Sequence, residues 1–194
     1  MPRTEKRKNK IISVVTSRQP SLNVVLENIH DPHNVSAIFR TCDAVGVPKI
    51  SLVYTSESYP KIGKKTSASA FKWIEKVKYD SIENCYKKLK EAGFKIFVSS
   101  ISENSRDLYD LDLTKKAAIV LGNEHRGVSN EAAELADEKF FIPMFGMVQS
   151  LNVSVAAAVT LYEAMRQRIK KGMYDKSEMD EVSINKQIEM WLKK

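Results

Sequence analysis

Short apolar runs alternate along the chain with segments in which apolar residues recur every three to four positions. Runs of four to eight apolar or alternating residues are typical of strands, whereas the longer period is typical of helices. This alternation predicts an α/β fold, a mostly parallel sheet with helices on both faces. The strands are expected at residues 22–28, 49–55, 71–79, 94–101, 117–122 and 139–144.

Two helices between these strands are expected to end at a glycine. Residues 33–46 form one apolar face and stop at Gly46, and residues 81–93 do the same before Gly93. In open sheets of this class, ligands bind beyond the carboxyl ends of the strands. The loops that follow the strands are therefore where a site is expected.

The two ends of the chain look like helical additions to one domain. Residues 1–18 predict a basic amphipathic helix, and residues 150–172 predict one long helix. A short linker, residues 173–180, then leads to a last helix with several apolar positions. The expected division is an N-terminal extension at 1–20, a core at 21–172 and a C-terminal extension at 173–194, all within a single domain overall.

Composition narrows the class of protein. The chain has 194 residues, of which 43% are hydrophobic and 28% are charged, as in globular proteins. Cys42 and Cys85 stand far apart at apolar helical positions, so a disulfide framework or a zinc cluster is not expected. No apolar run approaches membrane-spanning length, and the N-terminus lacks a secretory core. We expect a soluble cytoplasmic protein without a membrane partner.

The charge is strongly basic and unevenly distributed. The formal net charge is +7 and the isoelectric point is near 9.3. Basic residues gather at 3–10, at 59–73 and at 166–172. Such clusters attract phosphate backbones through counterion release. A nucleic-acid partner is favoured over the alternative, a surface that is merely rich in lysine.

The segment "IVLGNEHRGVS", residues 119–129, comes close to a phosphate-binding loop but fails as one. The loop needs Lys and then Ser or Thr directly after its second glycine, whereas Gly127 is followed by Val128 and Ser129. The two glycines of the segment are also not spaced as in the G-x-G-x-x-G motif of dinucleotide-binding proteins. What remains is a strand end, a permissive glycine and the carboxylate of Glu124. Taken alone, the segment is an ordinary strand-to-helix loop with Ser129 as the helix N-cap.

The segment "IPMFGMVQSLNVSVAAAV", residues 142–159, ends the last strand with uncharged polar residues in an apolar context. Buried amides and hydroxyls need partners, so they either cap local backbone or meet a ligand. Ser150 fits the N-cap of the long helix, but Asn152 is harder to explain by propensity or burial. Two glycine-bearing loops after neighbouring strands predict a pocket of backbone groups, which suits an adenine and a ribose.

The segment "ENIHDPHNVSAIFRTCDAVGV", residues 27–47, opens the first strand-to-helix unit. A metal site at its two histidines is disfavoured, because Pro32 makes a turn in which Asp31 and Asn34 serve as turn and cap residues. Arg40 lies in an otherwise apolar helix and therefore expects an anionic partner. That partner is either an internal carboxylate, Asp43 or Glu124, or the phosphate of a ligand.

Together, these three segments resemble the signature motifs of the SpoU, or SPOUT, RNA 2'-O-ribose methyltransferases, in the same order and across the core. The resemblance implies a sheet whose C-terminal part forms a deep trefoil knot, S-adenosylmethionine as methyl donor, no metal, and a homodimer. The short length of the chain, its basic N-terminal helix and its C-terminal segment resemble the TrmH type, which implies transfer to the ribose of a guanosine in the D-loop of tRNA, at position 18. The alternatives are another tRNA or rRNA ribose, or a non-catalytic RNA-binding or ribosome-assembly protein of this fold.

The resemblance also implies roles for particular residues. The catalytic positions match Asn34, Arg40, Glu124, Ser150 and Asn152. The cofactor-binding positions match Leu121, Gly122, Ile142, Met144, Gly146, Ser150 and Leu151. We expect tRNA phosphates to contact Arg7, Lys8, Lys10, Arg18, Arg166 and Arg168, with little base reading by those residues.

Overall fold

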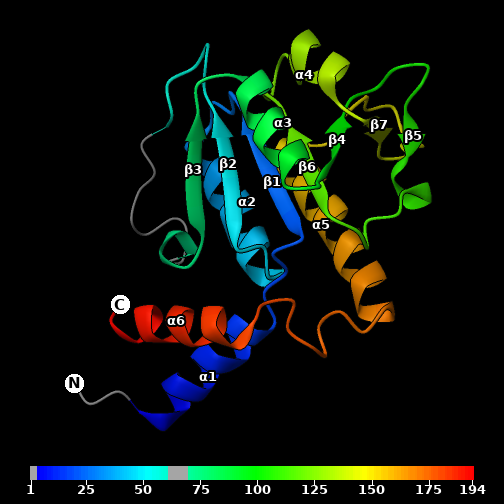
Figure 1. The fold of residues 1–194 in the computed structure, drawn as a ribbon. Helices are drawn as coiled ribbons and strands as arrows, with labels where there is room; N and C mark the ends of the chain where they lie inside the picture. Colours follow the sequence, from blue (N-terminus) through cyan, green and yellow to red (C-terminus); the bar gives the residue numbers. More distant parts are fainter. Residues whose placement is uncertain (1–3, 61–69) are drawn as a thin grey trace.

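The core is a seven-stranded sheet in which every pair of neighbouring strands is parallel (Figure 1). A computed structural model describes residues 4–60 and 70–194. The strand order is β3-β2-β1-β6-β4-β7-β5. The strands are β1 (Leu22–Glu27), β2 (Lys49–Val53), β3 (Glu75–Tyr79), β4 (Lys95–Ser99), β5 (Arg106–Asp107), β6 (Ala117–Leu121) and β7 (Glu138–Phe141).

All six expected strands are confirmed, with two differences. The strand β3 begins at Glu75, because Ala70–Lys72 form a short 3₁₀ helix, η1, in place of its expected first residues. The strand β5 was not expected, since two residues carry no periodic pattern. The central strands β1 and β6 are buried at every position. This explains why they appear in the sequence as nearly continuous apolar runs.

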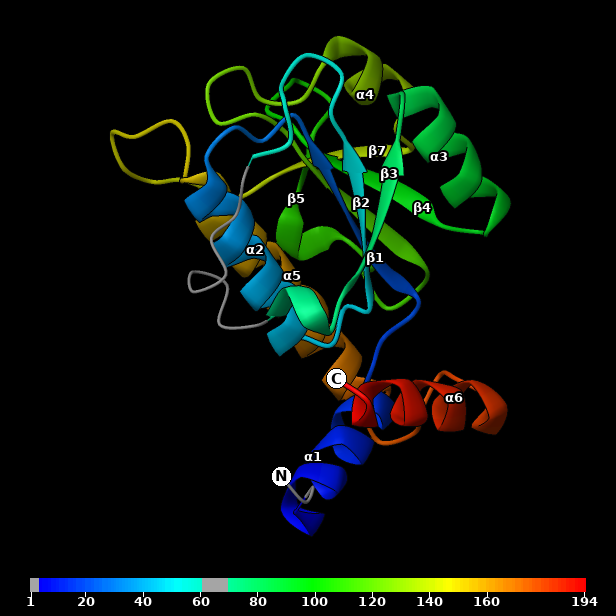
Figure 2. The ribbon, with the colours of Figure 1, turned by 90° about the vertical axis from the view of Figure 1, so that its left-hand side faces the viewer.

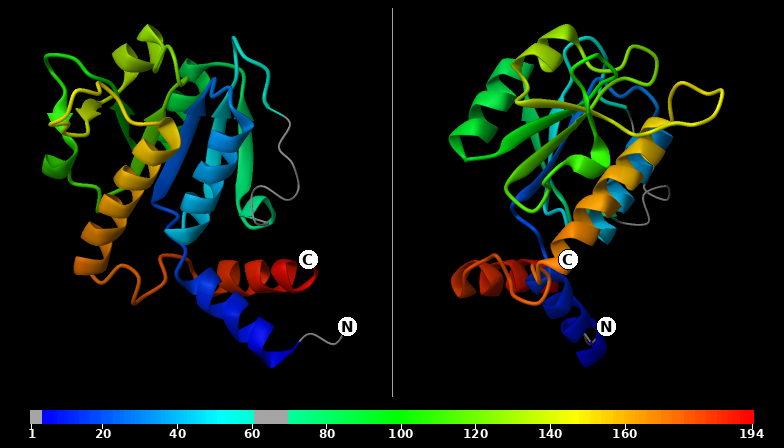
Figure 3. Two further views of the ribbon diagram at one scale, coloured as in Figure 1. Left: turned by 180° about the vertical axis from the view of Figure 1, so that it is seen from behind. Right: turned by 90° about the vertical axis from the view of Figure 1, so that its right-hand side faces the viewer.

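Helices cover both faces of the sheet, as the alternation predicted (Figure 3). On one face, α2 (Pro32–Ala44) and α5 (Val153–Lys170) lie side by side and share an apolar cluster with Val24. On the other face, α3 (Ile82–Glu91) and α4 (Asn130–Leu135) share a second cluster with Val25. Adjacent residues of a strand point to opposite faces, so β1 supplies both clusters.

The expected helix ends are confirmed at two glycines. Gly46 and Gly93 follow α2 and α3, and both have φ +83°. Only glycine adopts this left-handed conformation without steric cost. A Cβ on Gly46 would also lie 2.9 Å from the carbonyl oxygen of Ser17, so the turn packs tightly against the segment that leads into β1.

The two terminal helices, α1 (Glu5–Thr16) and α6 (Glu181–Leu192), pack together below the amino ends of the strands (Figure 1). Their contact is a third apolar cluster built on Ile11, Val15 and Trp191. None of the helices in the described parts of the chain is both long enough and apolar enough to cross a membrane. Residues 61–69, the middle of one basic segment, lie outside the described residues.

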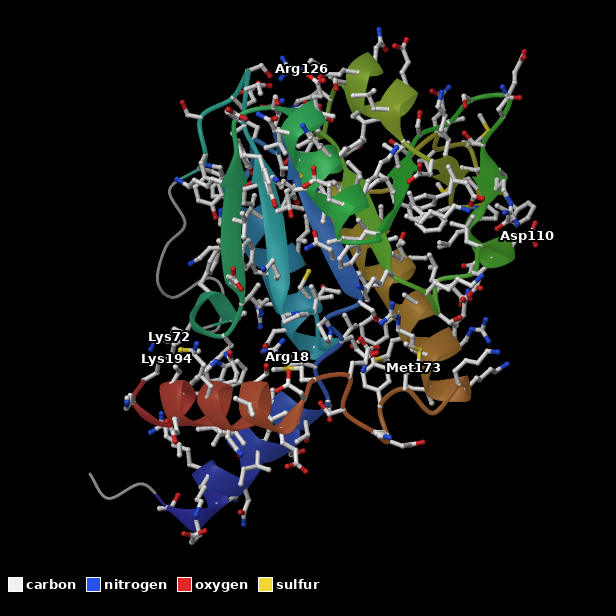
Figure 4. All side chains as sticks on the ribbon, in the orientation of Figure 1. Arg18, Lys72, Asp110, Arg126, Met173 and Lys194 are labelled. Atoms are coloured by element: carbon white, nitrogen blue, oxygen red, sulfur yellow. The ribbon has the colours of Figure 1, made fainter. Side chains whose placement is uncertain are left out.

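Two arginines expected to contact RNA are buried instead, so that expectation is wrong for both. Arg18 is 2% exposed and donates to Asp43 at 2.6 Å and to the carbonyl oxygen of Val47 at 2.9 Å. Its guanidinium also lies over the ring of Trp191, between the core and α6 (Figure 4). A buried charge is retained only when it is paired, so Arg18 serves to attach α6 to the core.

Arg168, near the end of α5, is 0% exposed. Its guanidinium donates to the carbonyl oxygens of Leu113 and Lys115 and to the side chains of Gln19 and Ser21. These acceptors come from the segments that lead into β6 and β1. Arg168 therefore fixes three parts of the chain to one another and is not available to a phosphate.

Candidate active site

A cavity of about 600 Å³ opens at the carboxyl edge of the sheet, where a site was expected. Its walls are the loop after β4, the loop after β6 and the loop that joins β7 to α5. The loop after β7, yellow in Figure 2, projects beyond the start of α2. Three loops that are distant in sequence thus enclose one space.

Six of the seven residues expected to hold the cofactor line this cavity. These are Leu121, Gly122, Ile142, Met144, Ser150 and Leu151. Gly146 is not part of the wall; it is exposed, and a Cβ built on it would meet no atom within 4 Å. The structure therefore places Gly146 in the projecting part of the loop, away from the cavity.

The glycine at position 122 is required by close packing of the backbone. A Cβ on Gly122 would lie 2.3 Å from the carbonyl carbon and oxygen of Gly127 and from the nitrogen of Val128. The loop closes on itself at this point through a bridge between Asn123 and Gly127, and Gly127 has φ +69°. Gly122 thus sets the shape of the loop that forms one wall of the cavity.

The chemistry of the walls fits S-adenosylmethionine. Leu121, Ile142 and Leu151 supply apolar surface for an adenine. Within the described residues, the backbone of residues 142–151 makes no hydrogen bond, and this stretch borders the cavity. Backbone N–H and C=O groups need partners, so these can bind the polar edges of an adenine, a ribose or an amino acid.

Glu124 joins the three signature segments through a chain of hydrogen bonds. Its carboxylate accepts from Asn34 Nδ2 at 2.9 Å and from the backbone N–H groups of His30 at 3.0 Å and Asp31 at 3.1 Å. In turn, Asn152 Nδ2 donates to Asn34 Oδ1 at 3.0 Å. Three of the five expected catalytic residues, Asn34, Glu124 and Asn152, are therefore in direct contact.

Asn152 has a second role, which corrects one expectation. It is the N-cap of α5, and its Oδ1 accepts from the backbone N–H of Ser154 at 2.8 Å. Ser150, the expected cap, is exposed on the cavity wall two residues earlier. The expectation for Ser129 is confirmed, because its side chain caps α4. At the start of α2 the cap is Asp31, which was expected only as a turn residue, and not Asn34, the expected cap, whose side chain donates to Glu124 instead.

The surroundings of Glu124 keep it ionised. Partial burial by itself raises the pKa of this carboxyl, but the hydrogen bonds from Asn34 and from the two backbone N–H groups outweigh burial and hold the pKa below its ordinary value of 4.5. A general base works best when its pKa is near the working pH. Glu124 is therefore suited to ordering the loops and poorly suited to accepting a proton at neutral pH.

Replacing Glu124 with glutamine is expected to lower kcat/KM by about 10-fold, because at least one of the three donors loses its acceptor and Asn34 is less firmly held. The shape of the pH–rate profile from pH 6 to 9 should not change. Because the folded pKa is depressed, the stabilisation by Glu124 is present at neutral pH and is lost only as the pH falls below about 4.5. Loss of an ionisation from the profile, with a drop of about 100-fold or more, would instead identify Glu124 as the base.

Arg40 lies apart from this cluster. It is exposed on α2 and is not part of the cavity wall. The two internal carboxylates considered for it bind other groups, since Asp43 pairs with Arg18 and Glu124 accepts from Asn34. Among the residues that the structure describes, no carboxylate lies within ion-pair distance of Arg40. Its guanidinium therefore remains open to an external anion.

Two further asparagines order the site and were not found from the sequence. Asn28 has φ +51°, a rare conformation for a residue other than glycine, and its Oδ1 accepts from the N–H groups of Thr55, Ser56 and Glu57. Asn123 donates to the carbonyl oxygen of Asn28 at 2.8 Å. These buried amides connect the loops after β1, β2 and β6. Each asparagine directly follows or nearly follows a strand, which was the available signal.

The other residues expected to contact RNA lie on the surface. Lys8 and Lys10 are exposed on α1, and Arg7 is half-buried there. Arg166 is exposed on α5 and forms two hydrogen bonds of 2.7 Å with Glu163. Among the described residues, no three His, Cys, Asp or Glu side chains are grouped so as to hold a metal ion.

Comparison with known proteins connects this geometry to a family. Residues 21–162 match the SpoU rRNA Methylase family. The tRNA (guanosine(18)-2'-O)-methyltransferase of Thermus thermophilus is 46% identical over 192 residues, which are 99% of this chain and 98% of that protein. The crystal structure of the A. aeolicus TrmH/SpoU tRNA modifying enzyme superposes with a TM-score of 0.90 at 41% identity, covering 96% of this chain and 95% of that one.

A third relative bears on the cofactor. The SpoU methyltransferase AviRb from Streptomyces viridochromogenes, solved in complex with AdoMet, has a TM-score of 0.70 at 27% identity, covering 78% of this chain and 59% of that one. The matched residues include all three loops of the cavity and the Glu124–Asn34–Asn152 chain. This chain is a member of the SpoU methylase family.

Proposed function

We propose that this protein transfers a methyl group from S-adenosylmethionine to the ribose 2'-hydroxyl of guanosine 18 in the D-loop of tRNA. The observation that carries the proposal is the hydrogen-bonded chain of Glu124, Asn34 and Asn152 at the rim of a cavity with open backbone groups. The likeness to relatives named for this reaction, over nearly the full chain, supports the choice of substrate.

In this proposal the donor's sulfonium makes its methyl carbon strongly electrophilic, so no metal is needed. The residues of the chain have to align the hydroxyl with that carbon and ease loss of its proton. Asn34 is held by Glu124 and by Asn152, and the two asparagines position the ribose. Ser150, exposed on the wall, is placed to bind the ribose or the donor. The C–O bond forms as the S–C bond breaks, and the proton leaves to phosphate or water.

In this proposal Arg40 supplies a positive charge next to the reacting hydroxyl. A guanidinium has a pKa above about 12 and does not lose its proton in proteins, so Arg40 is not the base. We propose that Arg40 binds the phosphate next to the target ribose and stabilises the negative charge that develops on the hydroxyl oxygen. Its lack of an internal carboxylate partner among the described residues agrees with this role.

The proposal includes a homodimer. Phe145, Met147 and Val148 are 100%, 99% and 63% exposed on the projecting loop, and Val155 and Tyr162 are about half exposed on α5. Exposed apolar groups of this kind mark interaction surfaces. A second copy packed against α2, α5 and this loop covers them and brings an Arg40 guanidinium to the cavity, which a single copy does not do. The knotted threading of the C-terminal part, implied by the family resemblance, is part of the same proposal.

tRNA is expected to lie along α1 and the exposed end of α5. Substituting Lys8 or Lys10 with alanine should weaken binding of all tRNAs alike and lower the slope of log K against log salt concentration by about 1 each. Filter binding at several salt concentrations measures this slope. Lys87→Ala, an exposed lysine on α3 far from α1, is the matched control and should leave the slope unchanged. A loss confined to one tRNA would contradict phosphate contact.

The test of the function is incubation of the protein with labelled S-adenosylmethionine and an unmodified tRNA transcript, followed by nucleoside analysis and mapping. The expected product is one 2'-O-methylguanosine at position 18. The same assay is run with a ribosomal RNA transcript. Label found only in that transcript, or at another nucleotide of the tRNA, would show that the substrate is a different one. No transfer to either RNA would support a binding protein of this fold in place of an enzyme.

A further inference from the structure

A second cavity of about 280 Å³ adjoins the first and is not used by the chemistry described above. It is lined by His30, Glu57, Asn123, His125 and Arg126. Three of these, Asn123, His125 and Arg126, line the first cavity as well, so the loop after β6 borders both spaces. Arg126 stands at the carboxyl edge of the sheet (Figure 4).

Two of the residues that line this second cavity form an ion pair. Glu57 Oε1 accepts from Arg126 Nη2 at 2.6 Å, and its other oxygen lies 3.3 Å from His30 Nδ1. The side chains of Glu57 and Arg126 are 24% and 59% exposed, so both remain accessible. A carboxylate has about four acceptor positions and a guanidinium has five N–H donors, so each keeps free capacity toward a ligand.

The backbone that carries this ion pair is preorganised by hydrogen bonds within the protein. The buried Asn28 holds the loop of Glu57 by accepting from three consecutive N–H groups. Asn123 holds the loop of Arg126, because its Oδ1 accepts from the N–H groups of His125 and Arg126. Asn28 and Asn123 are joined to each other, and the positive φ of Asn28 adds local strain. Strained residues fixed by their surroundings cluster at binding and catalytic sites.

The arrangement of donors and acceptors matches one nucleobase. An adjacent guanidinium and carboxylate present a donor followed by two acceptors, and the Watson–Crick edge of guanine presents the complement, with O6 accepting and N1–H and N2–H donating. Adenine offers a donor and then an acceptor on this edge, and cytosine offers a donor and two acceptors, so neither matches. Uracil matches two positions of three. Unstacked bases are read on this edge, commonly with a histidine or arginine plane stacked on them.

We propose that Arg126 and Glu57 read the guanine base of the target nucleoside, with Arg126 donating to O6 and Glu57 accepting from N1–H and N2–H. The inference rests on the proposed function and adds the residues that select the base. His30 links the two parts of the site, since its backbone N–H binds Glu124 while its side chain lines the second cavity. The flat rings of His30 and His125 provide stacking surface beside the edge that is read.

The test compares kcat/KM for tRNA transcripts that carry guanosine, inosine or adenosine at the target position. Inosine keeps O6 and N1–H and lacks only the 2-amino group. The wild-type protein should prefer guanosine to inosine by roughly 10-fold and guanosine to adenosine by more, as one or two base contacts provide. In Glu57→Ala, which removes both acceptor oxygens, the guanosine-to-inosine ratio should fall to near 1. Arg126→Ala should lower guanosine and inosine activity equally, because both bases carry O6.

Each ratio is measured within one variant, so a general loss of folded protein cancels out of it. Glu91→Ala is the matched control, because Glu91 forms an exposed ion pair with Lys88 on α3, and the ratio in this variant should equal that of the wild type. An unchanged guanosine-to-inosine ratio in Glu57→Ala overturns the base-reading role alone. Absence of methyl transfer by the wild type to any of the transcripts overturns the proposed function, and this inference with it.

Discussion

Replacing Arg40 with lysine is expected to lower kcat/KM for tRNA by about 100-fold, the loss seen when a preorganised donor to a developing oxyanion is removed. Lysine keeps the charge but lacks the planar fork that binds a phosphate at two points. Affinity for S-adenosylmethionine should not change, because the proposal assigns Arg40 to the phosphate and the hydroxyl of the tRNA, whereas the donor is held by the loops that line the cavity. Single-turnover methyl transfer at saturating donor, together with calorimetric titration of the donor, separates the two effects.

Arg106→Lys is the matched control for this substitution. Arg106 is exposed on the edge strand β5, pairs with Glu138 and is not part of the cavity wall. Its activity should equal that of the wild type. Nearly full turnover by Arg40→Lys would show that two-point binding of a phosphate by Arg40 is the wrong picture, and that positive charge alone suffices.

Replacing Gly122 with alanine is expected to weaken donor binding strongly and to destabilise the fold. The new Cβ would lie 2.3 Å from backbone atoms of Gly127 and Val128, which cannot move aside as a flexible side chain does. The loop after β6 must open, and overpacking of this kind costs about 1–3 kcal/mol or more of unfolding free energy. Calorimetric titration with S-adenosylmethionine should show affinity reduced at least about 10-fold, and thermal unfolding should show a lower midpoint.

Gly146→Ala is the contrasting variant, since a Cβ at Gly146 would meet no atom of its own chain within 4 Å. It should bind the donor and unfold as the wild type does. This comparison also tests the earlier assignment of Gly146 to the cofactor site. Wild-type affinity in Gly122→Ala would mean that donor binding does not depend on the closed loop. That result would contradict the assignment of this cavity as the donor site.

The fold was predictable because parallel strands buried on both faces leave apolar runs, and helices that cover them leave a longer period. The hydrogen-bonded cluster of Glu124, Asn34 and Asn152 was predictable in composition, since Glu124 and Asn152 stand out as polar residues at strand and helix ends. Their mutual arrangement was not, because the bonds from Asn34 to Glu124 and Asn152 join residues 90 and 118 positions apart.

The two wrong RNA contacts, at Arg18 and Arg168, have a common cause. Both residues were assigned to RNA from their charge alone, without asking whether their positions face the core. In α5 the buried residues Ala157, Leu161, Ala164 and Arg168 recur every three to four positions, so Arg168 belongs to the core face. Arg18 follows α1 at the point where the chain enters the core, and its partner Asp43 is 25 positions away. Burial of a charged group depends on such distant partners, which no local pattern contains.

The most direct measurement is a crystal structure of the protein with S-adenosylmethionine. The adenosine should lie between Leu121–Gly122 and residues 142–151, bound by backbone groups of the latter, with the methyl carbon directed toward Asn34 and Asn152. A donor bound at any other surface, with this cavity empty, would contradict the account.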